Sequence, residues 1–461
     1  MPDFATSVIL SGRDDMELEL LPNKPTPEST EVGSYFVANY PPFSAWKPEH
    51  LPAALTALDR SSNGSGEAPP LGLYLHIPFC RKRCKFCYFR VYTDKNSGDV
   101  DYYMQALARE AALYADRPAL AGRQFDFVYF GGGTPSFLSS EQLERLIERI
   151  RESWDWDHAR EVTFECEPGT LKKSKLETIK SIGVTRLSLG IEHFDDEILE
   201  IGGRAHKSAE VYRAYEWARE VGFPQINIDL IAGMVGETDD KWRLTVEKAL
   251  ALDPDNVTIY QMEVPHNTVV AREAKAAHIP TPVASWAQKR AWVGHAFSEF
   301  EKAGYVVSSA YTLVKPSNHL GFVYRDALWH GADMVGTGVA SFSHVGGVHY
   351  QNVDEWEEYT SALLDRDELP LARALPITDH QRLIREMILQ LKLGRIDAGY
   401  FRAKFGAEIT THFADAFGSL VNEDLATVRG DDIRLTRAGL LRVDELLPRF
   451  YEPQYRGVRY T

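Results

Sequence analysis

Short apolar runs and longer amphipathic segments alternate along the chain from residue 71 onward. The apolar runs are strand-like, and the segments between them repeat their apolar positions at helical spacing. This pattern predicts strands near 72–77, 126–130, 161–166, 184–189, 225–231, 256–262 and 305–310, and helices near 100–116, 139–153, 171–182, 207–222, 237–251 and 284–303. Such alternation is typical of a parallel α/β fold, and we expect the first six strands to form a partial barrel.

The segments on either side of this pattern have a different composition. Residues 1–70 show little periodicity and end in a linker-like stretch rich in Ser, Gly and Pro. The aromatic run at 35–46 is too apolar for disorder, so we expect this N-terminal extension to pack on the barrel. Residues 376–461 predict helices with one short hairpin. The expected architecture is α/β: a TIM-type partial (β/α)6 barrel at 71–310, an N-terminal extension and a mainly helical C-terminal domain.

Three of the four cysteines, Cys80, Cys84 and Cys87, lie within eight residues directly after the first predicted strand. Thiolates this close together repel one another unless a cation takes up their charge. An all-thiolate site suits zinc or an iron-sulfur cluster. Structural zinc sites have four protein ligands, and no fourth ligand lies nearby in the sequence. An iron-sulfur cluster with three cysteine-bound irons and one free iron therefore fits the number of cysteines better than zinc.

Candidate binding groups follow the other predicted strands. In parallel barrels the active-site groups gather at the carboxyl ends of the strands, so we expect these groups to form one site. They are Gly131, Gly132, Gly133 and Thr134 after the second strand, Glu165 at the third, Glu192 at the fourth, Asp229 at the fifth and Met262 at the sixth.

Composition narrows the class of protein. The chain has 461 residues, 44% of them apolar, which is enough for a large core and more than one domain. Its net charge of -15 argues against a nucleic-acid binder. No window is apolar enough to span a bilayer, and the first thirty residues do not have the pattern of a signal peptide. Few cysteines and no disulfide framework predict a reducing, cytoplasmic location.

The spacing C-x3-C-x-F-C after a strand resembles the signature of the radical S-adenosylmethionine (radical SAM) superfamily. The wider string from Tyr74 to Cys80 is similar to the branch that contains the oxygen-independent coproporphyrinogen III dehydrogenases. The resemblance implies that the three cysteines bind three irons of a 4Fe–4S cluster, and that the amino and carboxylate groups of SAM chelate the fourth. It also implies that Tyr74 and Phe86 border the cofactors.

The resemblance extends to the residues at the strand ends. In this branch the glycine segment, here 131–133, holds the amino group of SAM, and a Glu, a Gln, an Arg and an Asp surround SAM molecules. Glu165, Arg204 and Asp229 match this set in type and spacing, whereas Glu192 replaces the glutamine. The resemblance implies that Arg204 pairs with a SAM carboxylate, and that Asp229 or Glu165 binds ribose hydroxyls or an amino group. Salt bridges internal to the fold are the alternative.

Two further departures concern the substrate. The dehydrogenases have another cysteine two residues after the last cluster ligand, where this chain has Phe89. They have an alanine near SAM where this chain has Met262. Both positions lie where a substrate or a second SAM would sit, so coproporphyrinogen chemistry does not follow from the motif alone.

The resemblance implies a radical SAM oxidoreductase of porphyrin and heme biosynthesis. SAM cleavage would give a 5'-deoxyadenosyl radical that takes hydrogen from a tetrapyrrole-like substrate, with oxidative decarboxylation of coproporphyrinogen III as the expected reaction. A flavodoxin or ferredoxin would supply electrons. A C-methyltransferase using a second SAM, and a haem-binding chaperone, are the alternatives. Lack of the extra cysteine and the Gln261 position are compatible with the chaperone.

The remaining candidates stay open. Residues 311–375 resemble the glycine-rich segment that closes the catalytic half in this family. There, His330, His344 and His349 are candidates for substrate contact, although such histidines are more often structural. Cys166 is expected to be a buried, inert thiol. Five cations in the cysteine loop either form a solvated surface or offset the thiolates and favour an anionic substrate: Arg81, Lys82, Arg83, Lys85 and Arg90.

Overall fold

The computed structural model describes residues 39–61, 68–265, 267–279, 282–316 and 321–457. Six parallel strands follow one another in chain order and in space. They are β1 (Leu71–Ile77), β2 (Phe125–Gly132), β3 (Glu161–Cys166), β4 (Arg186–Glu192), β5 (Gln225–Ala232) and β6 (Asn256–Gln261). All six agree with the predicted strands to within a few residues, and they confirm the α/β partial barrel.

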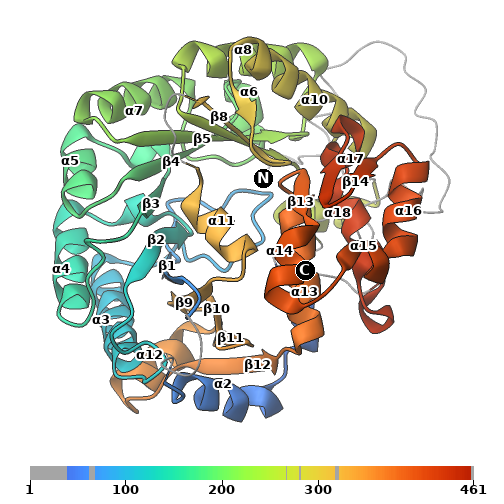
Figure 1. The fold of residues 1–461 in the computed structure, drawn as a ribbon. Helices are drawn as coiled ribbons and strands as arrows, with labels where there is room; N and C mark the ends of the chain where they lie inside the picture. Colours follow the sequence, from blue (N-terminus) through green and yellow to red (C-terminus); the bar gives the residue numbers. More distant parts are fainter. Residues whose placement is uncertain (1–38, 62–67, 266, 280–281, 317–320, 458–461) are drawn as a thin grey trace.

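Helices connect these strands and cover their outer side (Figure 1). They are α3 (Ser97–Ala115), α4 (Ser140–Arg151), α5 (Lys173–Ser181), α6 (Asp196–Ile201), α7 (Ser208–Val221) and α8 (Asp239–Leu252). Capping boxes fix two of the starts, with Asn96 paired to Asp99 in α3 and Ser139 paired to Gln142 in α4. The short α6, capped by Asp195, was not predicted because six residues are too few to show helical periodicity.

The sheet continues past both edges of the six-stranded set. Beyond β6 come α9 (Val269–Ala277), α10 (Trp286–Lys302), β7 (Val306–Val307) and β8 (Thr312–Val314). A strand is present at the predicted position near 305–310, but β7 is only two residues long, and the strand β8, which pairs antiparallel with both β7 and β6, was not predicted. On the other side, β9 (Asp333–Thr337) pairs in parallel with β1.

The glycine-rich segment thus adds further strands to the sheet. After β9 the strands β10 (Phe342–Val345), β11 (Val348–Asn352) and β12 (Leu371–Pro376) add in antiparallel order, with α12 (Trp356–Leu364) between the last two. Within the described residues one sheet of twelve strands results. Its strand β9 was missed because Gly336 weakens the strand pattern. A side chain at Gly336 would meet the backbone of Phe342 at 2.1 Å.

Helix α11 (Val323–Trp329) packs against the inner side of β2, where Tyr324 contacts Tyr129 at a ring distance of 4.3 Å. Figure 1 shows α11 crossing in front of the parallel strands. The carboxylate of Glu161 accepts hydrogen bonds from the first two backbone amides of this helix at 3.0 and 3.1 Å. Helix α11 therefore closes one part of the barrel interior.

The C-terminal part lies beside the barrel opening (orange to red in Figure 1). It contains α13 (Asp379–Leu391), β13 (Arg395–Asp397), α14 (Ala398–Phe405), α15 (Ile409–His412), α16 (Ala414–Asn422), β14 (Ala426–Arg429), β15 (Asp432–Leu435), α17 (Arg437–Leu441) and α18 (Val443–Leu446). The buried Lys392 pairs with Asp444 at 2.9 Å, and its carbonyl accepts from the amide of Ala310 at 2.8 Å. The ion pair lies within the C-terminal part, and the hydrogen bond from Ala310 joins this part to the barrel.

The N-terminal segment that the structure describes packs on β10 to β12, together with α2 (Leu51–Leu58). Trp46 is 2% exposed and stacks on His349 at 5.1 Å. Tyr40 contacts Tyr451 at a ring distance of 5.0 Å, which brings the two ends of the described chain together. The proline-spaced stretch at 20–27 and most of the linker-like stretch lie outside the described residues. In the described part no helix is long and apolar enough to cross a membrane.

Candidate active site

The cysteine loop leaves β1 at Pro78 and returns at Tyr92. The backbone amide of Cys80 donates to the carbonyl of Tyr92 at 3.0 Å, and the amide of Tyr92 donates to the carbonyl of Pro78 at 2.8 Å. In the middle of the loop, Lys85 donates its amide to Gly202 and accepts one from Val270. The loop is thus fixed at its base and on two sides, although it contains no helix or long strand.

The electrostatics of the cysteines fit a site for a metal cluster. Burial raises the pKa of Cys80 to about 11 and that of Cys87 to about 12. Metal ligation requires the thiolate, so a bound cation must supply the energy of deprotonation. In the described ranges no group of three or more His, Cys, Asp or Glu side chains is placed to hold a metal ion. The arrangement suits a cluster whose irons each take one thiolate.

Arg204 joins the cysteine loop to the barrel interior. Its Nη1 donates to the Sγ of Cys84 at 3.3 Å, and its Nη2 donates to the carbonyl of Gly190 at 2.7 Å. The same Nη1 lies 3.5 Å from a carboxylate oxygen of Glu192. The buried Nε has no hydrogen-bond partner among the described residues. A buried donor without a partner is costly, and an anionic ligand would satisfy it.

A shift in the register between β4 and β5 occurs at Glu192, whose carboxylate lies near Arg204. The pairing of β4 with β5 shifts between Gly190 and Glu192, and Glu192 has a φ of 66°, which is rare for a residue with a side chain. Such strained positions cluster at functional sites. Burial raises the pKa of Glu192 to about 7, and the opposing effect of Arg204 only partly cancels it.

Two other predicted acids line the same interior. The hydroxyl of Tyr129 donates to Glu165 at 2.6 Å, and burial raises the pKa of Glu165 to about 7, with a further contribution from Asp229. Asp229 accepts hydrogen bonds from Ser188 at 2.8 Å and from Asn227 at 3.0 Å. Burial raises its pKa too. The interior therefore holds carboxyl groups that carry or release a proton near neutral pH.

The glycine segment packs directly against the cysteine loop. Gly132 has a φ of 114°, and a side chain there would meet the ring of His76 at 2.8 Å. A side chain at Gly133 would meet Phe79 and, at 3.1 Å, the Sγ of Cys80. Thr134 donates to that sulfur at 3.4 Å. Gly132 and Gly133 are therefore required because the glycine segment and the cysteine loop approach each other closely, whether or not a ligand binds there.

Three further predicted residues lie around these groups. Tyr74 stacks on Tyr129 at a ring distance of 5.7 Å. Met262 is 3% exposed and belongs to a small apolar cluster, separate from the main core, against which Phe86 also packs. An apolar cluster between the cysteine loop and the end of β6 suits a flat, uncharged ring. Most of the predicted site residues thus lie at or near the carboxyl ends of the strands or in the cysteine loop, whereas Tyr74 lies in the middle of β1 and Arg204 lies between α6 and α7.

Most cations of the cysteine loop are already paired. Arg81 lies 3.1 Å from Glu167, Lys85 lies 3.3 Å from Glu273, and Arg90 lies 2.6 Å from Glu355. Arg83 donates to the carbonyl of Cys87 at 3.3 Å. The sequence left open whether these cations form a charged surface or favour an anionic substrate, and these contacts favour a structural role for four of the five.

For two of the candidate histidines the structure favours the structural role that the sequence analysis gave as the more frequent one. His344 and His349 are 7% and 0% exposed, lie on neighbouring antiparallel strands and are joined by their Nδ1 atoms at 3.0 Å. His349 also contacts the carbonyl of Tyr40 at 3.1 Å. Buried between β10, β11 and the N-terminal segment, they do not face the barrel opening. His330 is exposed at the end of α11, and Cys166 is buried as predicted.

Sequence reasoning missed several residues that shape the site. Glu167 and His206 contact each other at 2.8 Å beside the cysteine loop. Lys289 is 1% exposed, donates to the carbonyl of Met262 at 2.7 Å, and has its pKa lowered by burial to about 8. Tyr129 lies in the middle of an apolar strand. Of these residues, only Glu167 could have been identified from the sequence as a candidate, because it lies two residues after Glu165 at the end of a predicted strand.

Comparison with known proteins shows what this chain is similar to. The model of the radical SAM superfamily matches residues 74–249. The chain is 28% identical over 388 residues to the oxygen-independent coproporphyrinogen III oxidase of Escherichia coli, covering 82% of this chain and 81% of the oxidase. It is 29% identical over 383 residues to the heme chaperone HemW of Bacillus subtilis, covering 82% of this chain and 98% of HemW.

The solved structure of coproporphyrinogen III oxidase (HemN) from Escherichia coli has a similar fold. The TM-score is 0.78 at 25% sequence identity, covering 90% of this chain and 96% of the oxidase. The superfamily match confirms the predicted pair of cofactors, a 4Fe–4S cluster and SAM. The chain thus contains a radical SAM domain and is homologous to both the HemN oxidases and the HemW chaperones.

Proposed function

We propose that this protein is a SAM-cleaving enzyme that takes hydrogen from a tetrapyrrole-like substrate, in an oxidative decarboxylation of the coproporphyrinogen III type. The observation that carries the proposal is the position of Arg204. One guanidinium contacts Cys84 and faces Glu192, so it connects the cysteine loop to the carboxyl groups inside the barrel. This connection supports a site in which one bound SAM molecule reaches both the cysteine loop and the barrel interior.

A 4Fe–4S cluster with SAM supplies the one-electron cleavage of SAM to methionine and a 5'-deoxyadenosyl radical. Cys80, Cys84 and Cys87 would hold the cluster. Arg204 offers its free Nε to a carboxylate, while Glu165 and Glu192, with raised pKa values, can donate a proton in a hydrogen bond to a hydroxyl. Residues of the barrel interior exclude water from this space.

The proposed substrate step is the oxidative decarboxylation of a propionate side chain. The radical would remove one hydrogen atom from the propionate carbon that is attached to the pyrrole ring. The carboxylate then leaves as carbon dioxide, a vinyl group forms, and one electron passes to a one-electron acceptor. A flavodoxin or ferredoxin is the proposed source of the electron that starts each turnover, and a cytoplasmic location is the setting in which such partners occur.

A heme chaperone is the second candidate, and one observation favours it. Phe89 stands where the dehydrogenases have their additional cysteine, and its side chain is 50% exposed at the mouth of the cysteine loop beside Tyr88. An exposed aromatic ring with a second ring packed behind it suits the face of a porphyrin. The chain also covers nearly all of the Bacillus subtilis HemW.

One experiment separates these functions. The anaerobically reconstituted protein is incubated with dithionite, SAM and coproporphyrinogen III, and nucleosides and porphyrins are identified by mass spectrometry. Loss of carboxyl groups with formation of 5'-deoxyadenosine is expected. Cys84→Ala should abolish both products, whereas Cys166→Ala, which removes a buried thiol outside the loop, should retain them.

Other products would redirect the assignment. Formation of 5'-deoxyadenosine with intact substrate would overturn the decarboxylation and keep a radical enzyme with another substrate. S-adenosylhomocysteine together with 5'-deoxyadenosine would indicate methyl transfer. Absence of SAM cleavage combined with tight heme binding and transfer to an acceptor would establish the chaperone.

A further inference from the structure

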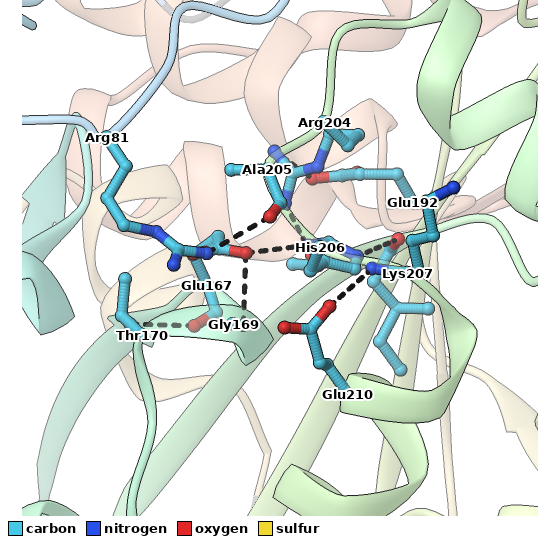
Figure 2. A network of polar contacts seen from close by, with 12 residues as sticks. Arg81, Glu167, Gly169, Thr170, Glu192, Arg204, Ala205, His206, Lys207 and Glu210 are labelled. Atoms are coloured by element: carbon cyan, nitrogen blue, oxygen red, sulfur yellow. Dashed lines mark hydrogen bonds and ion pairs between the residues drawn. The ribbon is translucent and has the colours of Figure 1, made fainter.

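Glu167 lies at the carboxyl end of β3, outside the set of residues that the sequence predicted for the site. Its side chain is 10% exposed. One carboxylate oxygen accepts from the Nδ1 of His206 at 2.8 Å and from the amide of Gly169 at 3.0 Å, and the other accepts from Arg81 at 3.1 Å. Figure 2 shows this carboxylate at the centre of the network.

Two partners of Glu167 come from different segments: Arg81 from the cysteine loop, and His206 from the segment that carries Arg204. Arg81 follows the cluster ligand Cys80 directly, and its Nη2 also donates to the carbonyl of Ala205 at 3.1 Å. Ala205 in turn follows Arg204, which contacts Cys84. Arg81 thus links the first part of the cysteine loop to the segment that carries Arg204.

His206 provides the third connection. It is 2% exposed, and its Nε2 lies 3.2 Å from the carbonyl of Ile191, the residue before Glu192. Burial raises the pKa of Glu167, but His206, Arg204 and Arg81 lower it more, so the carboxyl group is held as a carboxylate. A buried carboxylate with three donors fixes the positions of all of them.

The backbone next to Glu167 is shaped to admit Arg81. A side chain at Gly169 would meet the Nη2 of Arg81 at 2.3 Å and the Cβ of His206 at 3.2 Å. Gly169 does not have a positive φ, so its absent side chain serves the approach of Arg81 and not an unusual backbone conformation. Four residues from three separate segments of the chain therefore meet in one arrangement.

We propose that Glu167 and His206 are positioning residues that hold the cysteine loop, through Arg81, in register with Arg204. This inference deepens the proposed function and rests on its SAM site. The bridge formed by Arg81, Glu167 and His206 sets the distance between the cluster and the guanidinium, so that one SAM molecule can reach both. Without the bridge the three cysteines still hold iron, but SAM no longer meets both partners at once.

Two variants test the bridge from different sides. Glu167→Gln keeps the volume and removes the charge. Gly169→Ala displaces the flexible end of Arg81 without changing any charged residue. The reconstituted proteins are compared by iron and sulfide content, by circular dichroism, and by titration of the dithionite-reduced cluster with SAM, followed through the SAM-induced change in its electron paramagnetic resonance spectrum.

Both variants should keep the iron and sulfide content of the wild type and need about tenfold more SAM for the half-maximal spectral change. The double variant should be no weaker than Glu167→Gln alone, because both changes break the same bridge. Matched controls are Glu220→Gln, at an exposed ion pair with Lys173, and Gly418→Ala, where nothing lies within 4 Å. Both should stay within about twofold of the wild type.

Three results would overturn the inference: a wild-type response to SAM in either variant, additive losses in the double variant, or loss of iron together with the SAM response. The last would make the bridge a requirement for holding the loop and not a positioning device. Failure of the proposed function gives a different result, because the wild-type cluster would then show no response to SAM at all.

Discussion

The Nη1 of Arg204 lies 3.3 Å from the Sγ of Cys84, although 120 residues separate them in the chain. Burial lowers the pKa of this guanidinium, but Cys84, Glu192 and Glu167 raise it more, so it remains charged. A permanent positive charge beside the sulfur of Cys84, with one donor that has no partner among the described residues, is suited to holding the carboxylate of a ligand bound at the cysteine loop.

Replacing Arg204 therefore tests the SAM site. Arg204→Ala should weaken SAM binding by about 1.5–3 kcal/mol, because a charge-assisted pair is lost. Arg204→Lys keeps the charge but not the forked geometry and should recover only part of the affinity. Equilibrium titration of the reconstituted protein with SAM measures both. Arg213→Ala, at an exposed arginine of α7, is the control. Equal affinities of Arg204→Ala and the wild type would remove Arg204 from the site.

The three cysteines of the loop should account for all the iron. The triple variant of Cys80, Cys84 and Cys87 to alanine should bind no iron after anaerobic reconstitution and lack the charge-transfer absorption of a cluster, because no other thiolate lies in the loop. Cys166→Ala should keep full iron content, since this buried thiol belongs to the core beside β3. Iron retained by the triple variant would contradict the assignment.

We expect Phe89 to contribute to porphyrin binding and little to the free energy of unfolding. Its side chain is 50% exposed, so Phe89→Ala should change the free energy of unfolding by no more than about 0.5 kcal/mol. Phe79→Ala removes a fully buried ring from the base of the same loop and should cost about 3–5 kcal/mol. Urea unfolding of the two variants measures this contrast. If Phe89→Ala also leaves porphyrin binding unchanged, Phe89 lies outside the substrate site.

Glu110 should make stability depend on pH. It is buried in α3 and accepts from Gly338, Asn352 and Tyr359, and burial raises its pKa to about 7 from an ordinary value of 4.5. The folded protein thus holds the proton more tightly than the unfolded chain. The resulting stabilisation is complete below the unfolded-state pKa and is lost as the pH rises through 7.

Comparison with Glu110→Gln isolates this effect. Between about pH 5.5 and about pH 8, the free energy of unfolding of the wild type should fall by about 2 kcal/mol relative to that of the variant. Urea unfolding at a series of pH values gives the difference. Glu148→Gln, on the exposed face of α4, should show no such trend. A difference that does not vary with pH would mean that Glu110 has no raised pKa.

Local pattern was enough to predict much of this molecule. Hydrophobic periodicity gave β1 to β6 and their helices, since strands and helices differ in the spacing of buried positions. The cysteine loop was equally clear, because metal ligands on one loop are close in sequence and in space. Placing Glu165, Glu192 and Asp229 at one end of the barrel needed only the rule that parallel strands end on the same side.

Tertiary structure decided what depends on pairing between distant segments. Nothing local says that β9 joins β1, or that His344 and His349 face each other under Trp46 and not toward the barrel opening. The bridge from Arg81 to Glu167 and His206 is likewise invisible in the chain, because its members come from three separate segments. The sequence by itself determined which chemistry is present, and packing determined which charges are paired with each other and which remain available to a ligand.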